Sequence, residues 1–227
     1  GDGARTPAPA REFTVLYEDD HVLAIDKPAG VAVHGGSGVS FGVIEQLRQS
    51  RPHARFLELV HRLDRETSGV LLLAKKRGAL RALQDQFRTR DSSQPLLKVY
   101  EALVVGDWPA RLKVIDTPLK RSLDASGARH VRTAAADDAD ARRAVTLVEV
   151  VRRLPGFTLL EVTIRTGRTH QIRVHLASAG HPIAGDAKYG DFVLNRRLAR
   201  GEVVRARLDR MFLHARHLAV DNPASGE

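Results

Sequence analysis

The residue types best suited to catalysis lie in one short segment, 61–69, which reads His-Arg-Leu-Asp-Arg-Glu-Thr-Ser-Gly. It places Asp64 between Arg62 and Arg65, directly before an apolar run at 70–74. Aspartate is ionised at neutral pH, and a nearby guanidinium group favours the charged form. We therefore expect Asp64 to be a carboxylate that can act as a nucleophile or a base. From the local pattern alone, a surface turn with ordinary ion pairs explains this segment equally well.

A second polar segment, 165–175, leads into a predicted helix at 170–179. Thr169 is suited to cap the N-terminus of this helix, and Gly180 is suited to its C-terminal cap. Arg173 lies beside the inward-facing stripe and can reach a buried carboxylate, although an exposed helix charge is the alternative. The stripe itself follows helical spacing and consists of Ile172, Leu176 and Ala179.

Two further pairs of residues could take part in chemistry. Lys98 and Tyr100 share one face of a predicted strand, and a tyrosine there can stack on a base; a core or edge tyrosine is an equal alternative. His170 and His175 lie five residues apart, about 140° around a helix. They do not share a face, which argues against a two-histidine metal site, so we interpret both as structural or phosphate-facing.

The elements that must position these residues are mostly strands. Short apolar or alternating runs predict strands, and runs with helical spacing predict helices. Because strands outnumber helices without alternating with them, the pattern indicates an α+β fold with a mixed, largely antiparallel sheet. The predicted strands are 13–17 and 21–25 (as a hairpin), 69–74, 97–105, 144–151 paired with 157–164, and 212–220; the remaining predicted helices are 41–50 and 78–88.

The rest of the chain predicts loops and a tail. Residues 1–11 indicate a disordered tail or linker, and 12–227 a single catalytic domain. The segment 35–38 indicates a flexible loop, and the Ala/Asp-rich stretch 134–141 a solvated one. The loop at 35–38 is not followed by Gly-Lys-Ser/Thr, and Ser68 does not stand in a Gly-x-Ser-x-Gly motif, which argues against a P-loop and a nucleophile elbow.

Composition narrows the class of protein. The 227 residues include no cysteine, which excludes thiolate catalysis, thiolate metal sites and disulfides. A net charge of +9 and a pI of about 10.4 favour a polyanionic partner, most simply nucleic acid. No apolar run approaches the roughly 20 residues that span a bilayer. We expect a cytoplasmic, monomeric protein without membrane contact.

Four ordered motifs together resemble the RluA family of pseudouridine synthases. The resemblance covers roughly residues 13–220 and implies that family's core fold, in which a mixed, largely antiparallel sheet and flanking helices surround a central catalytic cleft. It also implies isomerisation of uridine to pseudouridine in RNA, with neither cofactor nor metal. The matching motifs are 61–69, Lys98-Val99-Tyr100, 166–175, and 180–186 continued by Tyr189-Gly190.

The resemblance also implies roles for single residues. Asp64 corresponds to the catalytic aspartate, Tyr100 to a tyrosine that stacks on the base and can take the C5 proton, and Arg173 to a basic residue that pairs with the aspartate. Arg62 corresponds to a side chain that fills the gap left by a flipped uridine, and Leu213 to an apolar residue lining the uracil pocket. Two further residues of the matched motifs are expected to contact the substrate, namely His61 and Arg168.

The segments 33–38 and 55–60 are most similar to the large-subunit ribosomal RNA branch, type C. That branch carries an S4-like RNA-binding domain that this sequence lacks, so we expect a catalytic piece of a longer protein. Structured RNA, most simply 23S ribosomal RNA, is the expected partner. Transfer RNA is an alternative substrate. Two other hypotheses are an RNA N-glycosidase using Asp64 and Asp186 and a non-catalytic RNA-binding module.

Overall fold

A computed structural model describes residues 6–36, 41–88 and 96–225. The chain divides into two compact units, a first unit of Gly1–Ser92 with Ala219–Glu227 and a second unit of Ser93–Leu218. Parts of the predicted tail and of the predicted loop at 35–38 lie outside the described residues. Within the described part of the chain, no helix is both long enough and apolar enough to cross a membrane.

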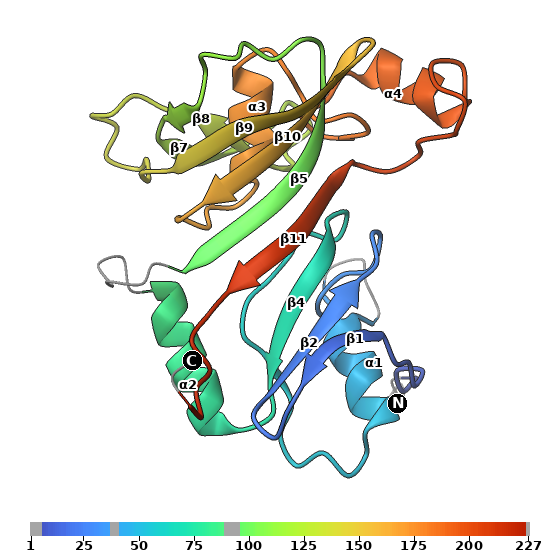
Figure 1. The fold of residues 1–227 in the computed structure, drawn as a ribbon, viewed down its shortest axis with the longest axis vertical. Coiled ribbons are helices and arrows are strands. Elements are labelled where there is room, and N and C mark those ends of the chain that lie inside the picture. The colour runs from blue at the N-terminus through green and yellow to red at the C-terminus, as the bar shows by residue number, and fades with distance from the viewer. Residues whose placement is uncertain (1–5, 37–40, 89–95, 226–227) are drawn as a thin grey trace. The chain divides into compact units, whose positions relative to one another are not determined.

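The first unit is built on antiparallel strands (Figure 1). Its sheet has the order β1–β2–β4, and β3 pairs with the other side of β4. The predicted hairpin is confirmed, since Asp19 Oδ1 accepts the backbone N–H groups of His21 and Val22 at 2.7 and 2.8 Å and so closes the turn. The elements are β1 (Thr14–Glu18), β2 (Val22–Lys27), α1 (Val43–Ser50), β3 (Glu58–Leu59), β4 (Ser68–Ala74) and α2 (Arg77–Arg88).

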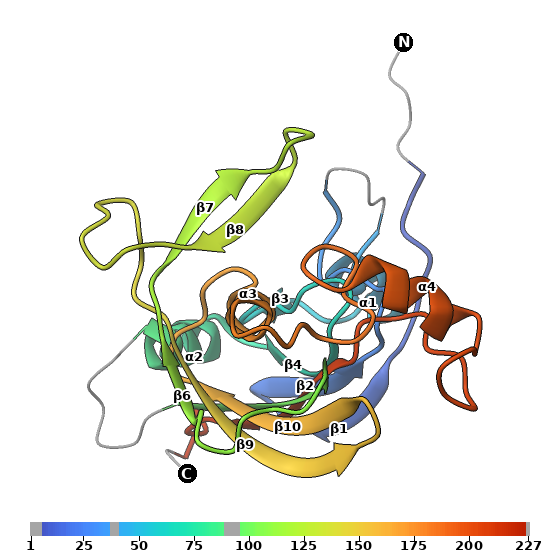
Figure 2. The same cartoon turned by 90° about the horizontal axis from the view of Figure 1, so that it is seen from above.

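The second unit contains a larger sheet and a separate hairpin. The sheet has the order β11–β5–β10–β9–β6, in which β5, β6, β9 and β10 pair antiparallel, and β11 also runs in the opposite direction to β5 in Figure 1. The hairpin β7–β8 stands apart from this sheet in Figure 2. The elements are β5 (Leu97–Val105), β6 (Val114–Asp116), β7 (Leu119–Leu123), β8 (Arg129–Thr133), β9 (Val145–Leu154), β10 (Phe157–Ile164), α3 (Gln171–Ser178), α4 (Phe192–Ala199) and β11 (Leu213–Ala219).

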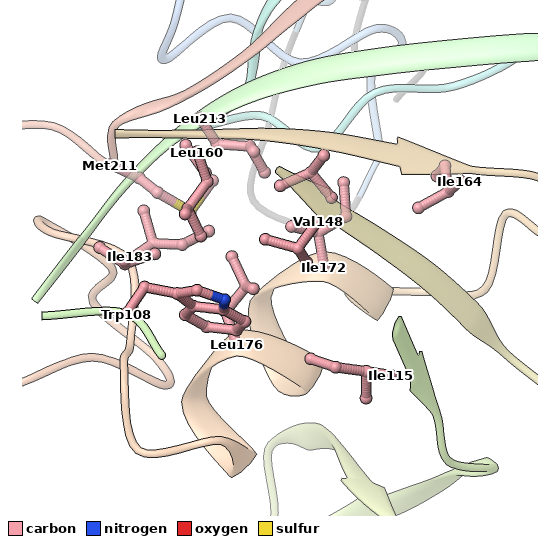
Figure 3. Packing of buried hydrophobic residues seen from close by; sticks show 13 residues of the cluster. Trp108, Ile115, Val148, Leu160, Ile164, Ile172, Leu176, Ile183, Met211 and Leu213 are labelled. Atoms are coloured by element: carbon pink, nitrogen blue, oxygen red, sulfur yellow. The ribbon is translucent and has the colours of Figure 1, made fainter. Parts of the chain in front are cut away.

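Helix α3 covers one face of the second unit's sheet. Ile172 and Leu176 point from α3 into an apolar cluster that includes Val148 of β9 and Leu160 of β10 (Figure 3). The predicted inward stripe is confirmed, because Ile172 and Leu176 are buried and Ala179 packs against the same cluster. Burial of each large apolar side chain stabilises the fold by about 1.5–3 kcal/mol. This gain fixes which face of α3 turns inward, and therefore which residues lie beside that face.

The start of α3 differs from the prediction. Its N-cap is His170 rather than Thr169, and His170 has a left-handed backbone with φ of +54°. The imidazole accepts a hydrogen bond from Tyr189 at 2.7 Å, and this contact holds His170 at the cap position. At the other end the prediction is confirmed, because Gly180 has φ of +87° and its N–H donates to the carbonyl of Ala177.

The α+β class and the mixed, mostly antiparallel strand pairing are confirmed. The expected central cleft and the description of 12–227 as one catalytic domain stay predictions.

Candidate active site

Asp64 lies in a tight turn of the first unit that enters β4. The N–H of Thr67 donates to the carbonyl of Asp64 at 3.0 Å. Leu63 and Thr67 on either side are buried, whereas Asp64 itself is half-buried. The turn is therefore pinned to the core on both sides of a carboxylate that keeps partial access to solvent.

A buried lysine fixes the same turn. Lys27, the last residue of β2, is 0% exposed. Its ammonium group donates to the carbonyl oxygens of Pro28, Val31 and Arg65 at 2.9, 2.6 and 3.0 Å. The carbonyl of Arg65 also accepts the N–H of Gly30 at 2.8 Å. The residue next to Asp64 is thus tied to the loop that follows β2.

His61 and Arg62 differ in their surroundings within this segment. His61 Nε2 accepts the backbone N–H of Leu72 at 3.0 Å, and its ring stacks on Phe87 with centroids 4.9 Å apart. Because Nε2 accepts, the neutral ring carries its proton on Nδ1. Arg62 is exposed. The predicted substrate contacts of both residues stay predictions.

In the second unit, Arg173 does reach a buried carboxylate, that of Asp186. Arg173 Nε and Nη2 donate to the two carboxylate oxygens at 2.9 and 2.8 Å, and both side chains are buried. Burial raises the pKa of Asp186, but the hydrogen bonds and charge of Arg173, with the N–H groups of Lys188 and Tyr189, outweigh it and hold the pKa below its usual value. The alternative of an exposed helix charge at Arg173 is wrong.

Tyr189 connects this ion pair to α3 and to the β7–β8 hairpin. The guanidinium of Arg173 lies 5.1 Å from the centroid of the Tyr189 ring. The Tyr189 hydroxyl accepts the N–H of Val131 at 3.0 Å and donates to Nδ1 of His170 at 2.7 Å. One aromatic side chain therefore helps to fix the direction of Arg173 and the cap of α3 together.

The remaining predicted residues of the second unit lie on its sheet and on the turn before α3. Tyr100 lies on β5 opposite Val162 and packs against the apolar cluster to which Leu213 belongs. Lys98, on the same face, is half-buried, and burial lowers the pKa of its amine. Arg168 Nε donates to the carbonyl of Arg143 at 3.0 Å, which holds its side chain along the turn.

His175 is structural. Burial lowers its pKa against the opposing effects of the Thr117 carbonyl and the Asp116 charge. Its Nε2 donates to the Thr117 carbonyl at 2.8 Å, and its Nδ1 accepts from the Thr146 hydroxyl at 2.7 Å. This neutral histidine therefore links α3 to Thr117, in the loop between β6 and β7, and to Thr146 of β9.

The predicted site residues therefore fall into two groups. The first unit contains His61, Arg62 and Asp64; the second contains Tyr100, Arg168, Arg173 and Leu213. The predicted pairing of Arg173 with Asp64 stays a prediction, and the contact that the structure adds is the one between Arg173 and Asp186.

Comparison with known proteins decides the family. A family model described as RNA pseudouridylate synthase matches residues 21–178, more than half of the chain. The chain belongs to this family. The predicted resemblance is confirmed, and the matched range contains Asp64, Tyr100 and Arg173.

Two relatives of this pseudouridylate synthase family member share about half of its sequence. It is 50% identical over 213 residues to the ribosomal large subunit pseudouridine synthase C of Escherichia coli (strain K12), which covers 94% of this chain and 63% of that relative. It is 48% identical over 216 residues to the protein of that name in Haemophilus ducreyi, covering 95% and 63%. The chain thus spans less than two thirds of the length of these relatives.

Solved structures of the family share the fold. The human RNA pseudouridylate synthase domain containing 4 is 29% identical with a TM-score of 0.71, covering 90% of this chain and 83% of that one. The human RNA pseudouridylate synthase domain containing 1 has a TM-score of 0.76 over 97% and 83%, and at 24% identity it supports the fold alone.

Sequence reasoning missed the role of Lys27 and the partner of Arg173. Lys27 stands at the end of an apolar strand and is followed by Pro-Ala-Gly, but lysine is rarely fully buried unless it has a partner, so this position did not predict its burial. Tyr189 was recognised only as part of a matched motif, and Asp186 only as part of that motif and as a carboxylate of the glycosidase hypothesis. No spacing rule connects Asp186 to Arg173, 13 residues earlier on another element.

We expect Lys27→Met in this pseudouridylate synthase family member to lower the free energy of unfolding by roughly 3 kcal/mol, because three partly buried carbonyl oxygens lose a charged donor. Urea denaturation measures this change. Lys76→Met, at an exposed position directly before α2, is the control and should stay within about 0.5 kcal/mol of wild type. Equal urea midpoints for Lys27→Met and wild type would refute the anchoring role.

Proposed function

We propose that this chain isomerises uridine to pseudouridine in RNA, and that its substrate is large-subunit (23S) ribosomal RNA. The observation that carries the proposal is the 50% identity to a ribosomal large subunit pseudouridine synthase C over 94% of the chain. A partly accessible carboxylate in a turn fixed by a buried lysine supports it, because catalysis needs a charged group held in one direction. We further propose that it acts in the cytoplasm as a monomer.

The reaction breaks the C1′–N1 bond, turns the uracil and joins C1′ to C5, with loss of the C5 proton and gain of one at N1. Asp64 supplies the carboxylate that acts covalently or as a base. Tyr100 is assigned to stack on the uracil and to accept the C5 proton. Arg173 supplies positive charge, held in place by Asp186. This chemistry rearranges one nucleotide without an external redox partner.

Substrate access requires that the target uridine leave the base stack, at a cost of a few kcal/mol. Arg62 is assigned to occupy the vacated space, which suits its exposed position. His61 and Arg168 are assigned to contacts with the RNA, and Leu213 to the apolar wall beside the base. A stacking contact of about 1–3 kcal/mol per base offsets much of the cost of extrusion.

The environment of Asp186 disfavours the N-glycosidase hypothesis. A glycosidase pair needs one carboxyl group with a raised pKa that can donate a proton. The pKa of Asp186 is instead lowered, and both its oxygens already accept hydrogen bonds from Arg173. The same carboxylate is well suited to orient an arginine.

The proposal is tested by incubating the purified chain with unmodified transcripts of 23S ribosomal RNA and of transfer RNA, followed by digestion to nucleosides and chromatography. We expect pseudouridine in the ribosomal transcript and no free uracil. Free uracil would support the glycosidase hypothesis, and pseudouridine in transfer RNA alone would change the assigned substrate. RNA binding without either product would favour the non-catalytic module.

A further inference from the structure

The exposed face of α4 combines apolar and basic side chains. Phe192 and Val193 in its first turn are 51% and 61% exposed. Arg196 and Arg197 in the helix and Arg200 at its C-cap follow Val193 at spacings of three, four and seven residues, and all three are exposed. On a helix these positions fall within one arc, because residues three and four apart are neighbours. We call these five residues the α4 face.

The opposite side of α4 is anchored in the second unit. Leu198 is buried in a cluster with Phe157 and Ala184. Asn195 Nδ2 donates to the carbonyl of Asp186 at 2.8 Å, and its Oδ1 accepts the N–H of Gly185 at 2.8 Å. The α4 face is therefore carried rigidly by the loop that holds the partner of Arg173.

Helix stability alone does not explain this face. Arginines in the last turn favourably oppose the helix dipole, but like charges four residues apart, such as Arg196 and Arg200, repel one another. Glu202 lies 3.8 Å from both Arg197 and Arg200, whose side chains remain 55% and 69% exposed. A dipole effect also gives no reason for Phe192 to be in solvent.

We propose that the α4 face is an RNA-binding surface, on which the three arginines contact phosphates and Phe192 stacks on an unpaired base. Arginine pairs with phosphate bidentately, and an exposed aromatic ring offers a sequence-tolerant platform for a base. The +9 net charge of the chain suits the same partner. The assignment rests on the proposed function, since it takes RNA as the substrate, and extends it to a surface outside the predicted site residues.

The test compares two triple variants in their binding to a 23S ribosomal RNA transcript, measured by filter binding at several salt concentrations. Arg196→Ala/Arg197→Ala/Arg200→Ala removes the charges of the α4 face. Arg111→Ala/Lys113→Ala/Arg152→Ala removes the same charge from other exposed positions of the second unit. We expect the first to weaken binding about tenfold and to reduce the salt slope by about 2–3, and the second to change binding less than about threefold.

A third variant separates stacking from charge. Phe192→Ala should weaken binding about fivefold or more while leaving the salt slope unchanged, because no phosphate contact is lost. For all variants, the maximal rate of pseudouridine formation at saturating RNA should match wild type, with a higher KM for the α4 variants.

The outcomes separate this surface from the proposed function. If wild type makes no pseudouridine yet the α4 triple variant loses RNA affinity, the proposed function fails and the surface stands. If wild type makes pseudouridine but the two triple variants bind RNA equally, the surface is refuted alone. A wild-type chain that does not bind the transcript would overturn both the proposed function and the RNA-binding surface. If the α4 face instead binds an acidic protein or an anionic membrane, the two triple variants should have equal affinities for RNA.

Discussion

Asp64→Asn is expected to lower the rate of pseudouridine formation by about a thousandfold or more, since a positioned carboxylate acting as base or nucleophile contributes on this order. Asparagine has nearly the same size as aspartate and leaves the backbone hydrogen bond from Thr67 intact. RNA affinity should therefore stay within about twofold of wild type. Single-turnover assays with excess enzyme measure the rate, and filter binding measures the affinity.

The matched control for this substitution is Glu66→Gln. It makes the same chemical change two residues further along the turn, where the carboxylate forms a long, exposed contact of 3.9 Å with Arg65. Such contacts contribute little, so the control should retain the wild-type rate. Equal rates for Asp64→Asn and wild type would remove Asp64 from the mechanism. Equal losses in both variants would mean that charge in the turn, rather than Asp64, matters.

Asp186→Asn is expected to lower the free energy of unfolding by about 3–5 kcal/mol, because it leaves the buried guanidinium of Arg173 without its counter-charge. Urea denaturation followed by circular dichroism measures the loss. The conservative control is Asp191→Asn at the N-cap of α4, where asparagine caps as well as aspartate. An Asp186→Asn variant as stable as wild type would contradict the role assigned to the pair.

A double variant separates the structural role of Arg173 from its chemical role. Arg173→Met/Asp186→Leu replaces both charges by apolar side chains, which often restores much of the stability lost when one partner is removed. We expect its urea midpoint to exceed that of Asp186→Asn, and we expect the double variant to form no detectable pseudouridine because the positive charge of Arg173 is lost. If the double variant recovered activity together with stability, the role of Arg173 would be structural and not chemical.

The same pair predicts a pH dependence. The pKa of Asp186 is lower in the folded chain than in the unfolded chain, so its contribution to stability is present above the unfolded value of about 3.9 and lost as pH falls below it. The stability difference between wild type and Asp186→Asn should therefore be full at about pH 6 and shrink below about pH 4. A difference that grew on acidification would have the wrong sign for this ion pair.

Strands with a buried apolar face could be predicted from the sequence. β2, the buried strand β4 and the long pair β9–β10 appear close to their predicted ranges, since their alternation or apolar runs reflect burial directly. β1 is also close to its predicted range, although all five of its residues are exposed. The hairpin β7–β8 was missed. Only Leu119 and Val131 of its ten residues are buried, and the arginines and lysine between them hide any alternation.

The site could be predicted only where one short motif contains its chemistry. The segment around Asp64 is continuous in sequence, so its residue types are visible together. The contacts that hold this turn in place are not visible in the sequence, because Lys27 donates to the Arg65 carbonyl from 38 residues away. Likewise Thr169 has the right side chain to cap α3, but the hydroxyl of Tyr189 selects His170 instead. Such choices depend on tertiary contacts that local pattern does not encode.

We propose that this chain moves the glycosidic bond of uridine from N1 to C5 through the carboxylate of Asp64. Bond formation at C5 must expel the hydrogen from that carbon, so the most direct measurement is tritium release from a 23S ribosomal RNA transcript labelled with [5-³H]uridine. We predict release by the wild-type chain in step with pseudouridine formation, and none by Asp64→Asn. Tritium release that persists in Asp64→Asn, or uracil set free with its tritium retained, would contradict the account.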